Sequence, residues 1–301
     1  MNRVAQHPVQ AFLAALAAVG ILSIMDAVMK ALVIAIGIYA VSIWRSIVAL
    51  ILSGSLYLPR RVAWPARGVL RIHVLRGVIV TVMAALFFWG IGRVPLAQAI
   101  ALTFIAPLIA LMLAAAFLHE RIGPRTVGGS AAAFAGVIVI VLGQARAELG
   151  PEVLLGSVAI IGSALCYAAN IVLMRRQALA AKPLEISFFQ SLTVTILWLA
   201  LIPFAGLPDW PSAHWWAWIC VAALMSTTGS LLFAWAYARA EASYLAITEY
   251  SAFLWASALG WLVFAEGVSL YTLGGAALIV GGCVIAARGK VREPGEVEVA
   301  T

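Results

Sequence analysis

The chain has 301 residues, of which 64% are hydrophobic and only 10% are charged, and its mean hydropathy is +1.07. Soluble domains are about half apolar and about a quarter charged, so this composition excludes a soluble globular protein and predicts that most of the chain lies in lipid. The formal charge of +7 does not indicate nucleic-acid binding, because the basic residues fall between apolar runs instead of forming one basic domain.

Ten apolar runs follow one another along the chain. Each is close to the roughly 20 residues that a helix needs to cross the hydrocarbon core, and longer than the roughly 10-residue strands of a membrane barrel. The first run is also too long for the apolar part of a signal peptide, so a retained helix is expected there. The prediction is an all-α membrane protein with ten transmembrane helices. In chain order, the runs are residues 9–30, 37–58, 70–91, 95–117, 124–143, 153–174, 184–203, 213–237, 242–264 and 270–288.

The Lys and Arg residues predict how the helices are oriented in the membrane. If the N-terminus lies inside, the loops that hold most of the basic residues are also inside. The outer loops then receive only Lys30, Arg93 and Arg146. Because cytoplasmic loops carry such an excess of positive charge, both chain ends are predicted to be cytoplasmic, in a multi-pass protein of the inner (plasma) membrane.

The sequence also contains an internal repeat. Shifting it by 146 residues aligns LHERIGPRTVGGSAAAFAG (118–136) with FAEGVSLYTLGGAALIVGG (264–282). The aligned pairs are Glu120 with Glu266, Trp89 with Trp235, Arg93 with Arg239, Gly128 with Gly274, and Gly136 with Gly282. The glycines are expected to let helices approach closely. Five helices per copy is an odd number, so the second copy is inserted upside down. Such inverted repeats recur in secondary transporters, with the substrate between the copies.

The repeat divides the chain into a first five-helix unit (1–148), a second (149–290) and a polar tail (291–301). Together with Arg45 in the second run and the segment VPLAQAIALTFIAPLIALMLAAAFLHE (94–120), it resembles the EamA-type ten-helix transporters of the drug/metabolite transporter superfamily. In that segment, Pro107 stands thirteen residues before Glu120.

The resemblance covers about residues 9–290 and implies transport of small metabolites by alternating access. It also implies structural roles for Arg45, Pro107, Glu120 and Glu266. Three stretches are similar to the S-adenosylmethionine and riboflavin uptake branches of this superfamily: MDAVMKAL (25–32), HVLRG (73–77) and TTGSLLFAWAYARA (227–240).

Glu249 is a carboxylate inside the ninth run, about seven residues from its start, which is roughly 10 Å below the cytoplasmic edge. A charged group at the bilayer centre costs about 2.5–3.5 kcal/mol and usually faces a cavity. Glu249 is therefore interpreted as a proton carrier or a partner for a cationic substrate, with a structural hydrogen bond to a neighbouring helix as the alternative. Its repeat counterpart is Thr103, so only one copy carries the charge, which suits a binding group.

Other polar residues inside the runs have two interpretations each. Asp26 is one turn from Lys30, so an i,i+4 salt bridge near the outer surface is expected, with a pair to Arg45 as the alternative. Arg76 is expected to reach the cytoplasmic headgroups with its long side chain, or else to contact a substrate carboxylate or phosphate. His73 is expected at the interface.

Further candidates lie on the fourth, sixth and ninth runs. Ser163, Tyr167, Asn170 and Met174 share one face of the sixth run, which either hydrogen-bonds to neighbouring helices or lines a cavity, and the cavity is favoured. Gln98 and Thr103 are assigned similar roles. Phe104 and Tyr250 lie deep enough to stack on a substrate ring or cation.

The expected function is secondary transport of a small metabolite such as an amino acid or its derivative. A phosphate-binding GxxxxGK[ST] motif is absent, which excludes ATP as the driving force within this chain, and no HExxH or GxSxG motif indicates an enzyme. No cofactor or metal is expected. The expected partners are the lipid bilayer, a small-molecule substrate and protons, and not nucleic acid. Uptake of S-adenosylmethionine or riboflavin-like cofactors and a lipid flippase or scramblase remain as alternatives. Substrate identity, direction, coupling ion and oligomeric state stay open.

Overall fold

The computed structural model describes residues 8–60, 64–106, 108–109, 124–146, 150–237, 239, 245, 248–249 and 251–287, and within them every regular element is helical. The predicted all-α class is thereby confirmed. In chain order, the helices are α1 (Pro8–Ile36), α2 (Ile38–Tyr57), the 3-10 helix η1 (Leu58–Arg60), α3 (Arg67–Ile91), α4 (Leu96–Thr103), α6 (Pro124–Arg146), α7 (Pro151–Ala180), α8 (Pro183–Leu199), α9 (Ile202–Ala205), α10 (Ala213–Tyr237), α12 (Ser251–Phe264) and α13 (Leu270–Ala287).

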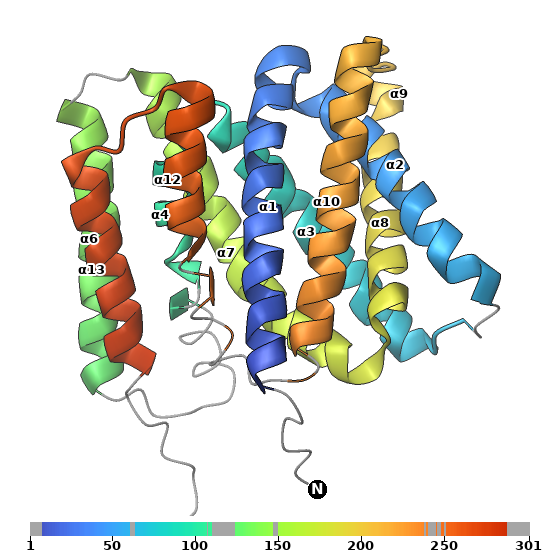
Figure 1. The fold of residues 1–301 in the computed structure, drawn as a ribbon, viewed down its shortest axis with the longest axis horizontal. Helices are drawn as coiled ribbons and strands as arrows, with labels where there is room; N and C mark the ends of the chain where they lie inside the picture. Colours follow the sequence, from blue (N-terminus) through green and yellow to red (C-terminus); the bar gives the residue numbers. More distant parts are fainter. Residues whose placement is uncertain are drawn as a thin grey trace, which may run out of the picture.

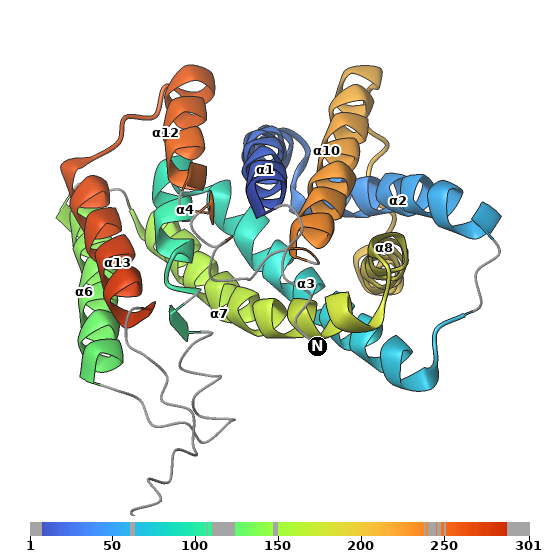
Figure 2. The ribbon, with the colours of Figure 1, turned by 60° about the horizontal axis from the view of Figure 1, so that its bottom comes forward.

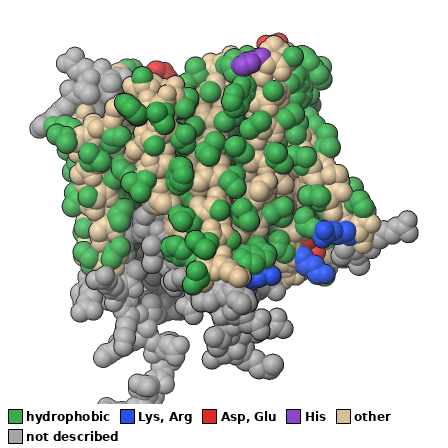
Figure 3. Space-filling model, in the orientation of Figure 1, with side chains coloured by type: hydrophobic (Ala, Val, Ile, Leu, Met, Phe, Trp, Pro, Cys, Tyr) green, Lys and Arg blue, Asp and Glu red, His purple; other side chains and the backbone are tan. Residues whose placement is uncertain are grey.

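Several helices have the length and composition to cross a membrane. Among the described residues, six are long and apolar enough, and they belong to α1, α2, α3, α7, α8 and α10; α6, α12 and α13 contain shorter apolar segments. Large apolar side chains project outward, including Ile51, Phe134 and Leu254, which are 63%, 61% and 70% exposed. Figure 3 shows apolar side chains over most of the visible lateral face. Water would not stabilise such a surface, whereas lipid tails do.

The long helices pack in pairs that join the two halves of the chain. α1 packs along α10 and α3 along α7, while α2 packs on α8, α4 on α12 and α6 on α13. Figures 1 and 2 show α6 and α13 side by side at one end, with α1 and α10 in the middle. If α1, α2 and α3 are exchanged for α7, α8 and α10, their partners under the 146-residue shift, the contacts among these helices map onto one another: the α1–α10 pair becomes the α7–α3 pair, and the α2–α10 contact becomes the α8–α3 contact.

Two pairs of repeat-related residues also share their local geometry. The guanidinium of Arg93 lies over the ring of Trp89 at 3.7 Å, and that of Arg239 lies over Trp235 at 4.0 Å. In both pairs, Arg Nη1 donates a hydrogen bond of 3.1 Å to the tryptophan carbonyl oxygen. Each arginine thus satisfies a carbonyl that the helix end leaves free. The two positions differ by the 146 residues of the predicted repeat.

A buried ion pair joins α1 to the ends of α4 and α12. Lys30 Nζ bonds to the carboxylate of Glu266, and it also donates to the carbonyl oxygen of Val94 at 2.8 Å. The second carboxylate oxygen of Glu266 accepts from the backbone N–H of Leu96 at 2.8 Å. The side chain of Lys30 is only 4% exposed.

The predicted Asp26–Lys30 salt bridge is therefore wrong, because Lys30 turns into the protein toward Glu266 and away from the helix surface. The predicted end of the first span at residue 30 is wrong for the same reason. The helix α1 continues past Lys30 to Ile36.

Glycines bring α6 and α13 into close contact. A Cβ atom built on Gly136 would lie 2.5 Å from the carbonyl oxygen of Gly275, and one on Gly282 would collide with the carbonyl of Gly129. The predicted packing role fits these two residues. It is wrong for Gly128 and Gly274, since nothing lies within 4 Å of a Cβ at either position.

Gly136→Ala is expected to destabilise the protein by about 1–3 kcal/mol, because the added methyl group forces the two helix backbones apart. Gly128→Ala, on the same helix but without a neighbour, is the matched control and is expected to be neutral or slightly stabilising. The melting temperatures of the two purified variants in detergent measure the difference. Equal melting temperatures would contradict the role of Gly136.

Candidate functional site

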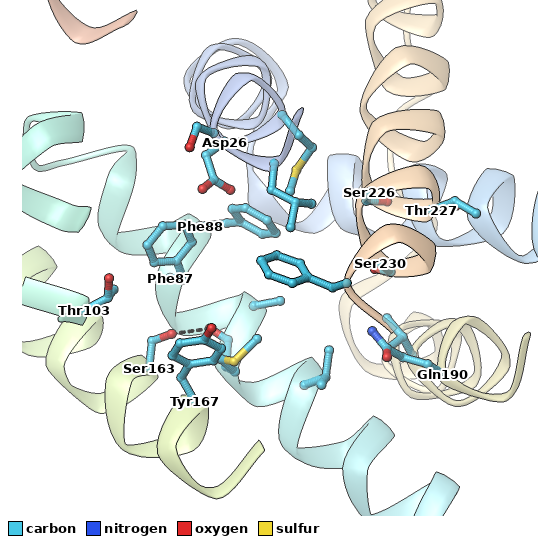
Figure 4. Close-up of a pocket in the computed structure, with 18 of the residues that line it drawn as sticks. Asp26, Phe87, Phe88, Thr103, Ser163, Tyr167, Gln190, Ser226, Thr227 and Ser230 are labelled. Carbon is cyan, nitrogen blue, oxygen red and sulfur yellow. Dashed lines mark hydrogen bonds between the residues drawn. The ribbon is translucent and has the colours of Figure 1, made fainter. Parts of the chain in front are cut away.

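A cavity of about 340 Å³ lies between the two halves of the chain. Figure 4 shows that its wall combines side chains from α1, α3, α4, α7, α8 and α10. Three ionisable side chains face it, namely Asp26, Arg45 and Glu249, together with hydroxyl groups such as those of Ser226 and Ser230. Its aromatic lining consists of Phe87, Phe88, Phe104, Tyr167 and Phe233. This volume is within the range of small-molecule sites.

A second cavity of about 180 Å³ adjoins the first, on the side of the bundle where α1 begins. The two share part of their walls, including Tyr167, Gln190, Phe233 and Glu249. The smaller one adds Arg76, Asn170, Met174 and Tyr237. All four members of the predicted stripe on the sixth span (Ser163, Tyr167, Asn170 and Met174) thus line one of the two cavities.

Glu249 is bound by two tyrosines at the junction of the cavities. Tyr167 on α7 donates its hydroxyl proton to Oε2 at 3.1 Å, and Tyr237 on α10 donates to Oε1 at 2.8 Å. No basic side chain forms an ion pair with Glu249 in the described part of the chain. The carboxylate therefore makes the hydrogen bonds to neighbouring helices that were considered as an alternative, and it also faces the cavities.

Arg76 is held by amide groups and not by carboxylates. Its Nε donates to Asn170 Oδ1 at 2.9 Å and its Nη1 donates to Gln177 Oε1 at 2.6 Å. Gln177 continues the chain of hydrogen bonds to His73, whose Nε2 lies 3.1 Å from Glu185 Oε1.

Two expectations for the third span are corrected by this network. Arg76 is 7% exposed and lines the smaller cavity, so its guanidinium does not reach the headgroup region. His73 is fully buried and not interfacial. Hydrogen-bond partners on α7 and α8 hold the two side chains inside the protein, and periodicity along α3 alone could not reveal those partners.

Asp26 and Arg45, which carry opposite charges, both face the larger cavity. The guanidinium of Arg45 lies 5.5 Å from the centroid of the Phe88 ring, and its Nη1 is 3.4 Å from Ser226 Oγ. Its buried Nε has no hydrogen-bond partner among the described atoms. Arg45, which was predicted to be structural, therefore also lies in the cavity wall.

The remaining predicted residues are placed as follows. Thr103 and Phe104 line the larger cavity, and the hydroxyl of Thr103 donates to the carbonyl of Ile100 at 2.7 Å. Gln98 is buried and lines neither cavity, so the role assigned to it has no support. Glu266 belongs to the ion pair with Lys30. Tyr250, Pro107 and Glu120 lie outside the described residues.

The face of α10 that lines the cavities was not predicted from the sequence. Ser226, Ser230, Phe233 and Tyr237 all line the cavities. Their spacing of four, three and four is the same as that of the stripe on α7. This periodicity was available in the sequence, because residues at such spacing share a helix face.

Known proteins resemble this chain over most of its length. The model of the EamA-like transporter family matches residues 9–142 and 154–288. "Pseudopaline exporter CntI" of Pseudomonas aeruginosa is 26% identical over 276 residues, which are 89% of this chain and 92% of that protein. A "Riboflavin transporter" of Brucella anthropi is 24% identical over 249 residues, covering 80% of this chain and 84% of that protein. One solved crystal structure shares the fold with a TM-score of 0.58 at 22% identity, over 92% of this chain and 96% of the other.

Proposed function

The chain belongs to the EamA-like transporter family, and from this premise we propose that it is a secondary active transporter that carries a small organic metabolite by alternating access of the central cavity. The observation that supports this most directly is the cavity itself. It lies between the two halves of the chain, and Asp26, Arg45 and Glu249 line it. Ionisable groups at such positions are costly in a membrane unless water or a ligand reaches them.

The proposed mechanism uses two inverted five-helix copies, residues 1–148 and 149–290, within ten transmembrane helices. The exchange symmetry of the helix contacts and the matching Arg–Trp pairs at 89–93 and 235–239 support this arrangement. Because the two copies have the same fold, each can adopt the conformation of the other. Exchanging their conformations gives the protein two equivalent states. In one state the cavity opens to one side of the membrane, and in the other state it opens to the opposite side.

In the proposed orientation, the protein lies in the inner membrane and both chain ends are in the cytoplasm. The first residues of α1 and α3 and the last residues of α7 lie at the same end of the bundle (Figure 1). Exposed basic residues flank these points, including Arg67, Arg71, Arg176 and Lys182. Figure 3 shows Lys and Arg at the lower edge, where acidic surface is visible among them, and acidic and His side chains without visible Lys or Arg at the upper edge. This distribution is the one that the positive-inside rule associates with a cytoplasmic lower edge.

The substrate is proposed to be a small metabolite such as an amino acid or its derivative. A cofactor with an aromatic ring is a second candidate, because riboflavin transporters are among the relatives and phenylalanines line the larger cavity. Proteoliposomes that contain the purified protein test the proposal by uptake of radiolabelled amino acids, S-adenosylmethionine and riboflavin, with and without a proton gradient. We expect saturable flux of at least one of these compounds. Lipid translocation without metabolite flux would instead indicate a flippase or scramblase.

A further inference from the structure

The smaller cavity holds one positive and one negative group, and neither has an ionic partner in the described part of the chain. Arg76 is bound only by the amide oxygens of Asn170 and Gln177, which leaves Nη2 without a hydrogen bond to the described residues. Among the described residues, Glu249 is bound only by the hydroxyls of Tyr167 and Tyr237. Buried charges of this kind are strongly unfavourable unless an opposite charge compensates them.

The other charged side chains in this region have an oppositely charged group nearby. Asp26 and Arg45 carry opposite charges and line the same larger cavity, and Lys30 is paired with Glu266. The carboxylate of Glu185 is paired with His73, which contacts Gln177, and therefore does not pair with Arg76. Of the charges that line the smaller cavity, Arg76 and Glu249 are the ones for which the described chain supplies no counter-charge.

α7 sets the separation of the two groups. Tyr167, which binds Glu249, and Asn170, which binds Arg76, are three residues apart on this helix. Side chains at this spacing are neighbours on one face, with about 5–6 Å between their Cβ atoms. The two charges are therefore presented to the same small volume from adjacent positions on the helix.

From this juxtaposition we infer that the smaller cavity binds an α-amino-acid zwitterion, with the substrate carboxylate on Arg76 and the substrate ammonium on Glu249. The inference rests on the proposed transport function. An α-amino acid carries both groups on one carbon, so a single molecule supplies the counter-charges of both residues. A guanidinium and a carboxylate form strong charge-assisted hydrogen bonds with these groups.

The adjoining larger cavity receives the substrate side chain. Phe233 lies in the shared wall, and Phe87, Phe88 and Phe104 extend the apolar surface beyond it. This lining favours an apolar or aromatic side chain over a charged one. The ligand class is therefore an amino acid with a large apolar, aromatic or ring-bearing side chain.

The test compares ligands that differ by one charge. The purified full-length protein in detergent is titrated with L-phenylalanine, with phenethylamine, which lacks the carboxylate, and with 3-phenylpropionate, which lacks the ammonium. L-leucine is a further zwitterion, and S-adenosylmethionine carries the same zwitterionic end on a positively charged sulfonium side chain. A ligand that binds the folded state raises its melting temperature. We expect at least one zwitterion to do so, and the matching compound with a single charge to bind at least about tenfold more weakly, because one buried partner is then left unpaired.

Two variants assign the charges to their residues. Arg76→Gln is expected to weaken zwitterion binding at least about tenfold and to leave the affinity for phenethylamine within about twofold. Glu249→Gln is expected to do the reverse, sparing 3-phenylpropionate. If the two residues were purely structural, each substitution would weaken the binding of all ligands alike. Arg71→Gln and Glu152→Gln change exposed residues outside the cavities and serve as controls. If Arg76→Gln does not fold, Arg76→Lys keeps the cation and is expected to retain the preference for zwitterions.

Two outcomes overturn the inference: none of the three zwitterions raises the melting temperature, or the singly charged analogues bind as tightly as the zwitterion. Its failure is distinguishable from failure of the proposed function. If riboflavin still accumulates in proteoliposomes, transport stands and only the assignment of a zwitterion falls. If no metabolite is transported, the proposed function itself falls.

Discussion

Glu249→Gln is expected to reduce metabolite flux at least about tenfold while the protein remains folded. The amide has nearly the same volume as the carboxylate and can still bond to Tyr167 and Tyr237, so packing between α7 and α10 is preserved. The variant lacks the negative charge, and a hydrogen bond to a charged group contributes about 1.5–3 kcal/mol. Initial uptake rates in proteoliposomes measure the loss, and the melting temperature in detergent reports the fold.

Glu152→Gln is the control for this experiment, because Glu152 is 67% exposed and pairs with Arg93 at the surface. The same assay with an imposed pH gradient separates the two roles considered for Glu249. If it carries the coupling proton, residual flux in the variant no longer responds to the gradient. Wild-type flux with an unchanged response to the gradient would exclude Glu249 from both binding and coupling.

Lys30→Met is expected to lower the free energy of unfolding by about 3 kcal/mol. Removing one partner of a buried pair leaves the other charge uncompensated, and such losses are typically about 3–5 kcal/mol. The lower end applies here because the side chain of Glu266 is 21% exposed and keeps its hydrogen bond to the N–H of Leu96. The loss also removes the bond from Lys30 to Val94, so the contact of α1 with α4 and α12 weakens. Denaturant titration of the purified protein in mixed micelles gives the value.

The double variant Lys30→Met with Glu266→Gln distinguishes charge from packing. It is expected to regain a large part of the lost stability, because neither side chain is then charged. For comparison, Glu152→Gln breaks an exposed ion pair and is expected to change stability by less than about 1 kcal/mol. If the double variant is as unstable as both single changes added together, the two side chains do not interact energetically.

Prediction of the membrane-spanning elements from sequence worked best where the constraint is local. The boundaries of α3 and α10 agree closely with the predicted runs 70–91 and 213–237. The prediction failed at Lys30 because a basic residue was interpreted as the end of a span. Lysine has a flexible side chain, and its direction depends on the partner that the tertiary structure provides, in this case Glu266.

The site residues were likewise predicted correctly where the signal is local and missed where it depends on contacts between distant segments. The face of α7 that carries Tyr167 and Asn170 was identified from spacing alone, since helical periodicity is a property of one segment. Tyr237, Gln177 and the position of Arg76 were not identified. Each acquires its role from a contact with a residue at least 12 positions away in the chain, and such contacts depend on how the helices rotate against each other.

The sequence by itself determined that this chain is a helical membrane protein with a repeated pattern, because a lipid environment requires long apolar segments whose backbone hydrogen bonds are satisfied within each helix. Only the tertiary structure decided which buried charges are neutralised and which face a cavity. Lys30 and Glu266 compensate each other, whereas Arg76 and Glu249 are left without ionic partners among the described residues. The physical reason is that the energy of a buried charge depends on the groups that surround it in space, and packing between distant helices brings those groups together.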